Sequence, residues 1–191
     1  AAAFAQEARS RKIDTLGVIR AGGDGPVAAV RQALAAKLTG VALEGEFPST
    51  DVQAVREVAA TAQAAVIEIL PRRLLRPGEA KELLATYQGV WPGIPVQPGG
   101  AAKAGPTGSP WVNTNMGFLL FARAATDAPV WIANPPPRGE VLKADNYLQA
   151  ICDAAVLGAR WVLDFDADFR RRLLERDPAT LAGWKRIAAH L

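Results

Sequence analysis

The chain has 191 residues and a formal net charge of +3, and 50% of its residues are hydrophobic. This length and composition predict one domain with a substantial core, and no apolar run approaches the roughly 18 residues of a membrane span. Cys152 is the single cysteine, which excludes an internal disulfide. His190 is the single histidine and lies next to the last residue of the sequence, which excludes most zinc sites and Ser-His-Asp or Cys-His catalysis. The positive charge is dispersed and does not favour nucleic acid as a partner.

The first half of the chain alternates short apolar runs with amphipathic patterns, which predict strands and helices in turn. Pro26 suits the first position of a helix, and Gly40 ends it. We predict strands at residues 15–20, 41–44 and 64–70. We predict helices at residues 26–38 and 77–87, and a third helix that is capped by one of residues 49–51 and ends at about residue 63.

The second half continues the alternation after a long irregular segment. Gly158 is a suitable residue to end a helix. We predict strands at residues 89–94, 129–133 and 160–164, and helices from 113 or 114 to 125, at 145–157, and beginning at Asp166 or Asp168 and at Asp177-Pro178.

The irregular segment covers residues 89–118 and is far longer than an ordinary connection. It contains Trp91 and Trp111, and tryptophans argue against disorder. Long ordered loops are commonly functional. We therefore expect this segment to form one wall of a site.

Six β/α units with short apolar strands predict an α/β fold with a buried parallel sheet. A (β/α) barrel normally has eight strands, so six units would form an abridged or truncated TIM-like barrel. An open doubly wound sheet accommodates six strands equally well, and periodicity does not separate the two. We expect an N-terminal extension at residues 1–12 and a single domain at residues 13–191.

Both architectures put working residues at the carboxyl ends of the strands. Carboxylates beside tryptophans are typical of sugar sites, and a glycosidase requires two carboxylates roughly 5–9.5 Å apart. Because they end neighbouring strands, Glu44 and Glu68 are the predicted catalytic pair, with Asp164 as an auxiliary. The predicted binding residues are Arg20, Trp91, Trp111, Asn113 and Asn115.

Several other polar and aromatic residues near the predicted strands and helices have a structural interpretation. Asp166 can serve as a helix cap, and Arg72 can form an ion pair with Glu68. Trp131 and Trp161 lie inside predicted strands, where a core position is expected. Cys152, in an alanine-rich helical pattern, is expected to be a buried thiol.

A competing motif follows the first predicted strand. The run from Arg20 to Gly25 (RAGGDG) is similar to a dinucleotide-binding glycine fingerprint, and Glu44 lies at about the right distance for a ribose contact. Asp24, however, would put a negative charge among the amides that should bind pyrophosphate. A nucleotide-binding domain is therefore an alternative.

Two segments, residues 88–94 (QGVWPGI) and 105–115 (GPTGSPWVNTN), resemble a group of secreted bacterial proteins described as glycosidase-like (β/α) barrels. The similarity continues through residues 129–131 and 160–164, so it covers about the second half of the chain. The segment Met116-Gly117-Phe118 departs from the order of residues in that group. The resemblance implies an abridged barrel and a carbohydrate-related role, but it assigns no catalytic residues.

These observations predict a protein that binds or hydrolyses an oligosaccharide or polysaccharide without a cofactor. A non-catalytic, barrel-derived module is the other alternative, and it could be a homo-oligomer because an unclosed sheet leaves edges that proteins normally cover. Ala3-Phe4-Ala5 is compatible with the remnant of an export signal, which predicts a secreted or periplasmic location; an ordinary alanine-rich helical or frayed end is equally compatible.

Overall fold

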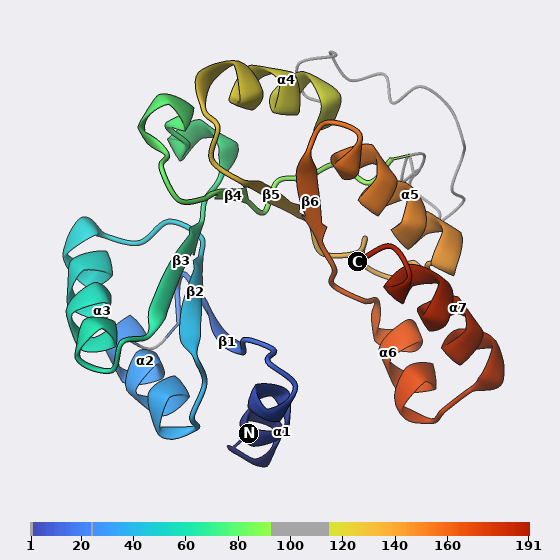
Figure 1. Ribbon diagram of the computed structural model, residues 1–191, viewed down its shortest axis with the longest axis horizontal. Helices are drawn as coiled ribbons and strands as arrows, with labels where there is room; N and C mark the ends of the chain where they lie inside the picture. The colour runs from blue at the N-terminus through green and yellow to red at the C-terminus, as the bar shows by residue number, and fades with distance from the viewer. Residues whose placement is uncertain (1, 24, 93–114) are drawn as a thin grey trace. The chain divides into compact units, whose positions relative to one another are not determined.

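The computed structural model describes residues 2–23, 25–92 and 115–191 (Figure 1). Within them the chain is a mixed α/β protein with two three-stranded parallel sheets and seven α-helices. It divides into two compact units, Ala1–Leu74 (unit 1) and Leu75–Leu191 (unit 2), each with one of the sheets. The predicted α/β class is therefore confirmed, and the described residues form no closed barrel.

Unit 1 contains a sheet with the strand order β1-β2-β3, the same order as in the chain. The two crossovers are helices, as parallel neighbours require. The strands agree with the predicted ones to within a residue or two. The elements are α1 (Ala2–Ser10), β1 (Leu16–Arg20), α2 (Pro26–Ala35), β2 (Gly40–Glu44), α3 (Ser49–Thr61), β3 (Ala65–Ile69) and the short 3₁₀ helix η1 (Arg72–Leu74).

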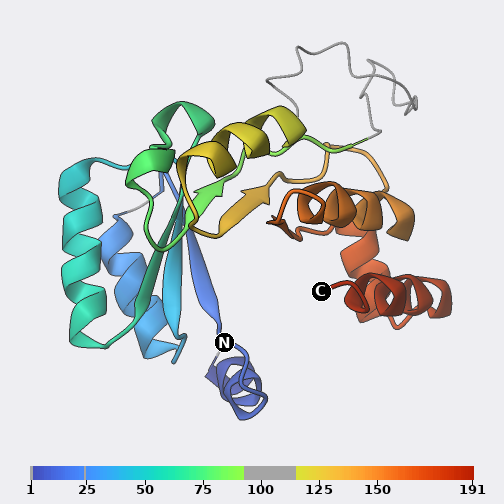
Figure 2. The same ribbon diagram turned by 45° about the horizontal axis from the view of Figure 1, so that its top comes forward.

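The core of unit 1 lies between the sheet and helices α2 and α3, which lie side by side in both views (Figures 1 and 2). Val41 and Leu43 alternate along β2 and point to this side, because side chains two apart share a face. Val30 of α2 and Val55 of α3 meet them, and all four side chains are fully or almost fully buried. The helices therefore cover one face of this sheet.

Unit 2 contains the second sheet, in which the strand order β4-β5-β6 again follows the chain. Its helices agree closely with the predicted ones after residue 113, and the last two begin after their aspartate caps. The elements are η2 (Pro77–Glu79), β4 (Leu84–Thr86), α4 (Asn115–Ala125), β5 (Val130–Ala133), α5 (Ala144–Ala155), β6 (Ala159–Val162), α6 (Ala167–Leu174) and α7 (Pro178–Ala188).

Aromatic side chains fill much of the core of unit 2. Trp91 contacts Trp161 and Tyr147 edge to face, with ring centroids 4.9 and 5.6 Å apart. Phe165 continues the cluster, with its ring centroid 5.1 Å from that of Tyr147. Trp161 is buried as predicted, whereas Trp131 of β5 is only half-buried. Such contacts add roughly 0.5–1.5 kcal/mol per pair to the burial of the rings.

The segment between residues 77 and 94 differs from the prediction. The expected helix at 77–87 is only the 3₁₀ turn η2, and the expected strand at 89–94 lies earlier, as β4. Leu84, Ala85 and Thr86 are all buried and pair with β5, so sheet formation overrides the helical preference of this segment. Residues 93 and 94 lie outside the described residues.

Two further details bear on the sequence expectations. Cys152 is exposed on α5, so the predicted buried thiol is wrong; the buried stripe of that helix is formed by Tyr147, Ala150, Ile151 and Ala154. None of the helices in the described residues is long and apolar enough to cross a lipid bilayer.

Candidate functional site

The register of β2 and β3 determines where the two predicted catalytic glutamates point. Leu43 is paired with Glu68, and Glu44 is paired with Ile69. Directly paired residues share a face and successive residues alternate, so Glu44 and Glu68 project from opposite faces of the sheet. Glu68 lies on the face that α2 and α3 cover, together with Leu43. The predicted pair therefore does not converge on one cleft.

Glu44 projects from the opposite face and forms an ion pair with Arg20. The two residues are register partners on β2 and β1, and the Arg20 Nε donates to Glu44 Oε1 over 2.8 Å. Both predicted residues thus lie at the carboxyl ends of their strands, side by side. Because the arginine side chain is 67% exposed and the glutamate 21%, water screens this pair strongly.

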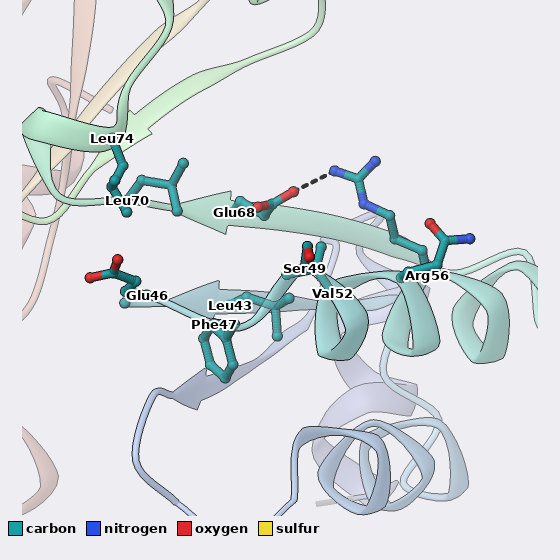
Figure 3. A pocket seen from close by; sticks show the side chains of 11 residues that line it. Leu43, Glu46, Phe47, Ser49, Val52, Arg56, Glu68, Leu70 and Leu74 are labelled. Carbon is teal, nitrogen blue, oxygen red and sulfur yellow. Dashed lines mark hydrogen bonds and ion pairs between the residues drawn. The ribbon is translucent and has the colours of Figure 1, made fainter.

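Glu68 forms its ion pair with Arg56, one side chain from β3 and the other from α3 (Figure 3). The alternative partner considered from the sequence was Arg72. Arg56 follows Val52 by four residues, which puts the two on adjacent turns of the same helix face. Arg72 is instead half-buried after β3, and this burial lowers the pKa of its guanidinium.

Glu68 and Arg56 line a cleft of about 340 Å³ in unit 1 (Figure 3). The cleft lies beside the carboxyl ends of β2 and β3 and the first two turns of α3. Its walls are partly apolar and partly polar, so one ligand could make both kinds of contact. The apolar lining residues are Leu43, Phe47, Val52, Leu70 and Leu74, and the polar ones include Glu46, Ser49 and Gln53.

Most of this lining was not anticipated from the sequence. Glu46 lines the cleft and forms an ion pair with Arg73. Phe47 and Gln53 were not singled out. One signal was available for Arg56, because it adjoins the apolar stripe of α3 that includes Val52 and Val55.

Two of the predicted binding residues, Trp91 and Asn115, are held in the interior of unit 2. Trp91 is 4% exposed, and its indole nitrogen donates to the Pro135 carbonyl over 3.1 Å. Both its ring contacts and its hydrogen bond are internal, so its face does not form an open platform for a sugar. Trp111 and Asn113 lie outside the described residues.

Asn115 is 2% exposed and joins three parts of unit 2. Its Oδ1 accepts from the Val90 amide over 2.8 Å, and its Nδ2 donates to the Val90 carbonyl over 2.6 Å. The same Nδ2 donates to Asp153 Oδ2 of α5 over 2.7 Å. These contacts fix the position of the backbone at Val90. The spacing of residues in the sequence does not predict them, because they join residues that are 25 and 38 positions apart.

Asp164, the predicted auxiliary carboxylate, lies two residues beyond β6 in unit 2. It is half-buried and lines a second cleft, of about 350 Å³. Asp166, also in this cleft, caps α6 by accepting from the amides of Asp168 and Phe169, so its interpretation as a cap is confirmed.

The glycine run after β1 forms the turn into α2. Gly22 and Gly25 have φ values of 87° and 40°, which residues other than glycine rarely adopt. Gly25 is the residue that precedes the first turn of α2, and Pro26 follows it. Asp24 lies outside the described residues.

Comparisons with known proteins add no functional assignment. No protein-family model matches the chain, and no curated protein or solved structure matches it. Within the described residues, no group of three or more histidine, cysteine, aspartate or glutamate side chains is arranged to hold a metal ion. The chemistry of the two clefts is therefore the basis for inferring function.

Proposed function

We propose that the protein binds carbohydrate, and that the cleft of unit 1 is its binding site. The observation that carries this proposal is the Glu68–Arg56 ion pair in a cleft with a partly apolar wall. The resemblance of the second half of the chain to secreted glycosidase-like proteins supports the same ligand class. A secreted or periplasmic location and an abridged (β/α) barrel are parts of this proposal.

The cleft offers the groups that a sugar needs. The carboxylate of Glu68 can accept hydrogen bonds from hydroxyl groups, and the guanidinium of Arg56 can donate to hydroxyl oxygens. Phe47 supplies an apolar surface for the C–H groups of a sugar ring. The volume of about 340 Å³ is at the lower end of the range for ligand pockets, which favours a short saccharide.

Binding is better supported than hydrolysis. Paired-carboxylate hydrolysis requires two carboxyl groups on either side of one glycosidic bond. Glu44 and Glu68 project from opposite sheet faces, so they do not provide this arrangement. We therefore propose Glu68 as a ligand contact.

The barrel proposal is supported by two features of the sheets. In each sheet the strand order follows the order of the chain, which is the order of barrel strands. In unit 1, both crossover helices cover the same sheet face, as they do in a barrel. A doubly wound sheet shares these features within one half, so an experimental structure of the whole chain is the test.

The binding proposal is tested with a panel of oligosaccharides by isothermal titration calorimetry. We expect at least one to bind, and we expect Glu68→Gln to weaken its binding by about tenfold or more, or about 1.4 kcal/mol. The matched control is Glu7→Gln, because Glu7 also forms an ion pair with an arginine, Arg11, but lies on α1 away from the cleft. Absence of any binding, or equal loss in both variants, would contradict the proposal.

A second candidate is a self-associating module, and the position of Val18 favours it. Val18 lies on β1 with the same orientation as Arg20, on the sheet face opposite α2 and α3, and it is 55% exposed. An apolar side chain there is suited to association with a second copy. Light scattering after size-exclusion chromatography should then detect a dimer or larger species that Val18→Asp shifts to monomer; a monomer at all concentrations contradicts it.

A further inference from the structure

The cleft of unit 2 has a composition that the carbohydrate proposal does not use. Its volume is about 350 Å³, and two segments form it, residues 135–141 and residues 164–170. Its apolar lining consists of Pro135, Pro136, Pro137, Val141, Phe165 and Ala167. The cleft therefore has an apolar wall large enough for a small organic side chain.

Two of the three aspartates in the cleft are already engaged. Asp166 accepts from the amides of Asp168 and Phe169 with one oxygen, and from the Leu142 amide and Tyr147 hydroxyl with the other. Asp168 forms ion pairs with Arg171 and Arg172. The carboxylate of Asp166 is therefore satisfied within the fold, and that of Asp168 is paired at the surface of α6.

Asp164 differs from both. It is half-buried, and within the described residues its carboxylate has no hydrogen bond or ion pair. A carboxylate that lines a cleft and has no protein partner can pair with a ligand that donates hydrogen bonds or carries positive charge.

Positive charge also remains unpaired around this cleft. Arg138 and Arg170 line it, are exposed, and have no ion pair in the part of the chain that the structure describes. Glu140 adds a second carboxylate in the turn after Arg138. Unpaired charges of both signs beside an apolar wall are complementary to a zwitterion with an apolar side chain.

We propose that this cleft binds a free α-amino acid with an apolar side chain. Its ammonium group pairs with Asp164, and its carboxylate pairs with Arg138 or Arg170, because a guanidinium matches a carboxylate in a bidentate pair. The side chain packs against the proline segment and Phe165. This site is independent of the cleft in unit 1 and of the carbohydrate proposal.

Three related probes separate these contacts: L-phenylalanine, phenethylamine, which lacks the carboxylate, and 3-phenylpropionate, which lacks the ammonium group. Binding to the ¹⁵N-labelled full chain is followed by amide shifts in NMR spectra. We expect L-phenylalanine to shift the amide signals of residues 138–141 and 164–170. We expect the affinity of both analogues to be lower by about tenfold or more. No shifts in this region, or equal affinity of all three probes, overturns the proposal.

Variants then test each contact. Asp164→Asn should weaken L-phenylalanine by about tenfold and leave 3-phenylpropionate unchanged, whereas Arg138→Gln with Arg170→Gln should weaken L-phenylalanine and leave phenethylamine unchanged. The control is Asp127→Asn, which removes the same charge from an exposed site before β5. Unchanged binding of L-phenylalanine to Asp164→Asn, or equal weakening by Asp127→Asn, overturns the proposal.

Discussion

Asp166 connects three segments of unit 2 through one buried carboxylate. Its two oxygens accept four hydrogen bonds, and its own amide donates to the Tyr147 hydroxyl over 3.0 Å. The contacts join α5, the start of α6 and the segment at Leu142. Hydrogen bonds to a charged group each contribute roughly 1.5–3 kcal/mol, so this network has a large part in ordering the walls of the cleft.

Tyr147 makes the stability of this network dependent on alkaline pH. Burial is the main cause that raises the pKa of its phenol well above the ordinary value of 10. The hydrogen bond from the Asp166 amide lowers this pKa in part, and the side-chain hydrogen bond and negative charge of Asp166 raise it. The folded state therefore holds this proton more tightly than the unfolded state. The resulting contribution to stability is complete below pH 10 and is lost as the pH rises through the folded pKa.

We therefore predict that the free energy of unfolding decreases with pH above about 10, and that Tyr147→Phe reduces the decrease. The variant should also be less stable at pH 7 by about 1–3 kcal/mol, because one oxygen of Asp166 loses its hydroxyl donor in a buried site. Urea unfolding between pH 7 and 11 measures both effects. Tyr87→Phe is the control, since Tyr87 is only half-buried. An identical pH dependence in wild type and Tyr147→Phe would contradict the assignment.

At the scale of elements, Gly89 shows how closely the segment after β4 approaches β5 and β6. Its amide donates to the Ala133 carbonyl over 2.8 Å. A Cβ atom at this position would lie 2.9 Å from the Trp161 ring and 3.0 Å from the Ala133 carbonyl oxygen. A residue with a side chain would therefore separate this segment from the sheet.

Gly89→Ala is predicted to destabilise the protein by about 1–3 kcal/mol through overpacking. The matched control is Gly78→Ala in η2, where an added Cβ meets nothing within 4 Å. Thermal unfolding of the two variants, followed by near-ultraviolet circular dichroism of the tryptophans, measures the difference. Equal stability of the two variants would show that the segment can move away without loss.

The elements that the sequence predicted well have local signals. The strands of unit 1 are short apolar runs bounded by glycine, proline or polar residues, and the caps of α6 and α7 are aspartates that accept from the following amides. β4 was placed wrongly because its buried side chains depend on pairing with β5, which is distant in the chain.

The candidate site was harder to predict for the same reason. The sequence shows that Glu44 and Glu68 end neighbouring strands. It does not show their ion-pair partners, because Glu44 pairs with Arg20, 24 positions away, and Glu68 pairs with Arg56, 12 positions away. Which face each occupies depends on register, and a shift of one residue reverses it. The contacts of Asn115 with Val90 and Asp153 likewise depend on the tertiary structure.

At the scale of the whole molecule, each unit has its own sheet and its own core. The core of unit 1 is built from aliphatic side chains of β2, α2 and α3. That of unit 2 is built around Trp91, Tyr147 and Trp161. Because local opening follows cooperative structural units, a change in one core should affect the hydrogen exchange of that unit most.

Val55→Ala tests this expectation. Val55 of α3 is 0% exposed and contacts the apolar face of the sheet, so loss of two methyl groups should destabilise unit 1 by about 2 kcal/mol. Amide hydrogen exchange should accelerate in β1–β3, α2 and α3, and much less in β4–β6 and α5. Val156→Ala, at a position 78% exposed, removes the same groups without a cavity and should leave both units unchanged. Equal acceleration throughout the chain would mean that the two cores unfold as one cooperative body.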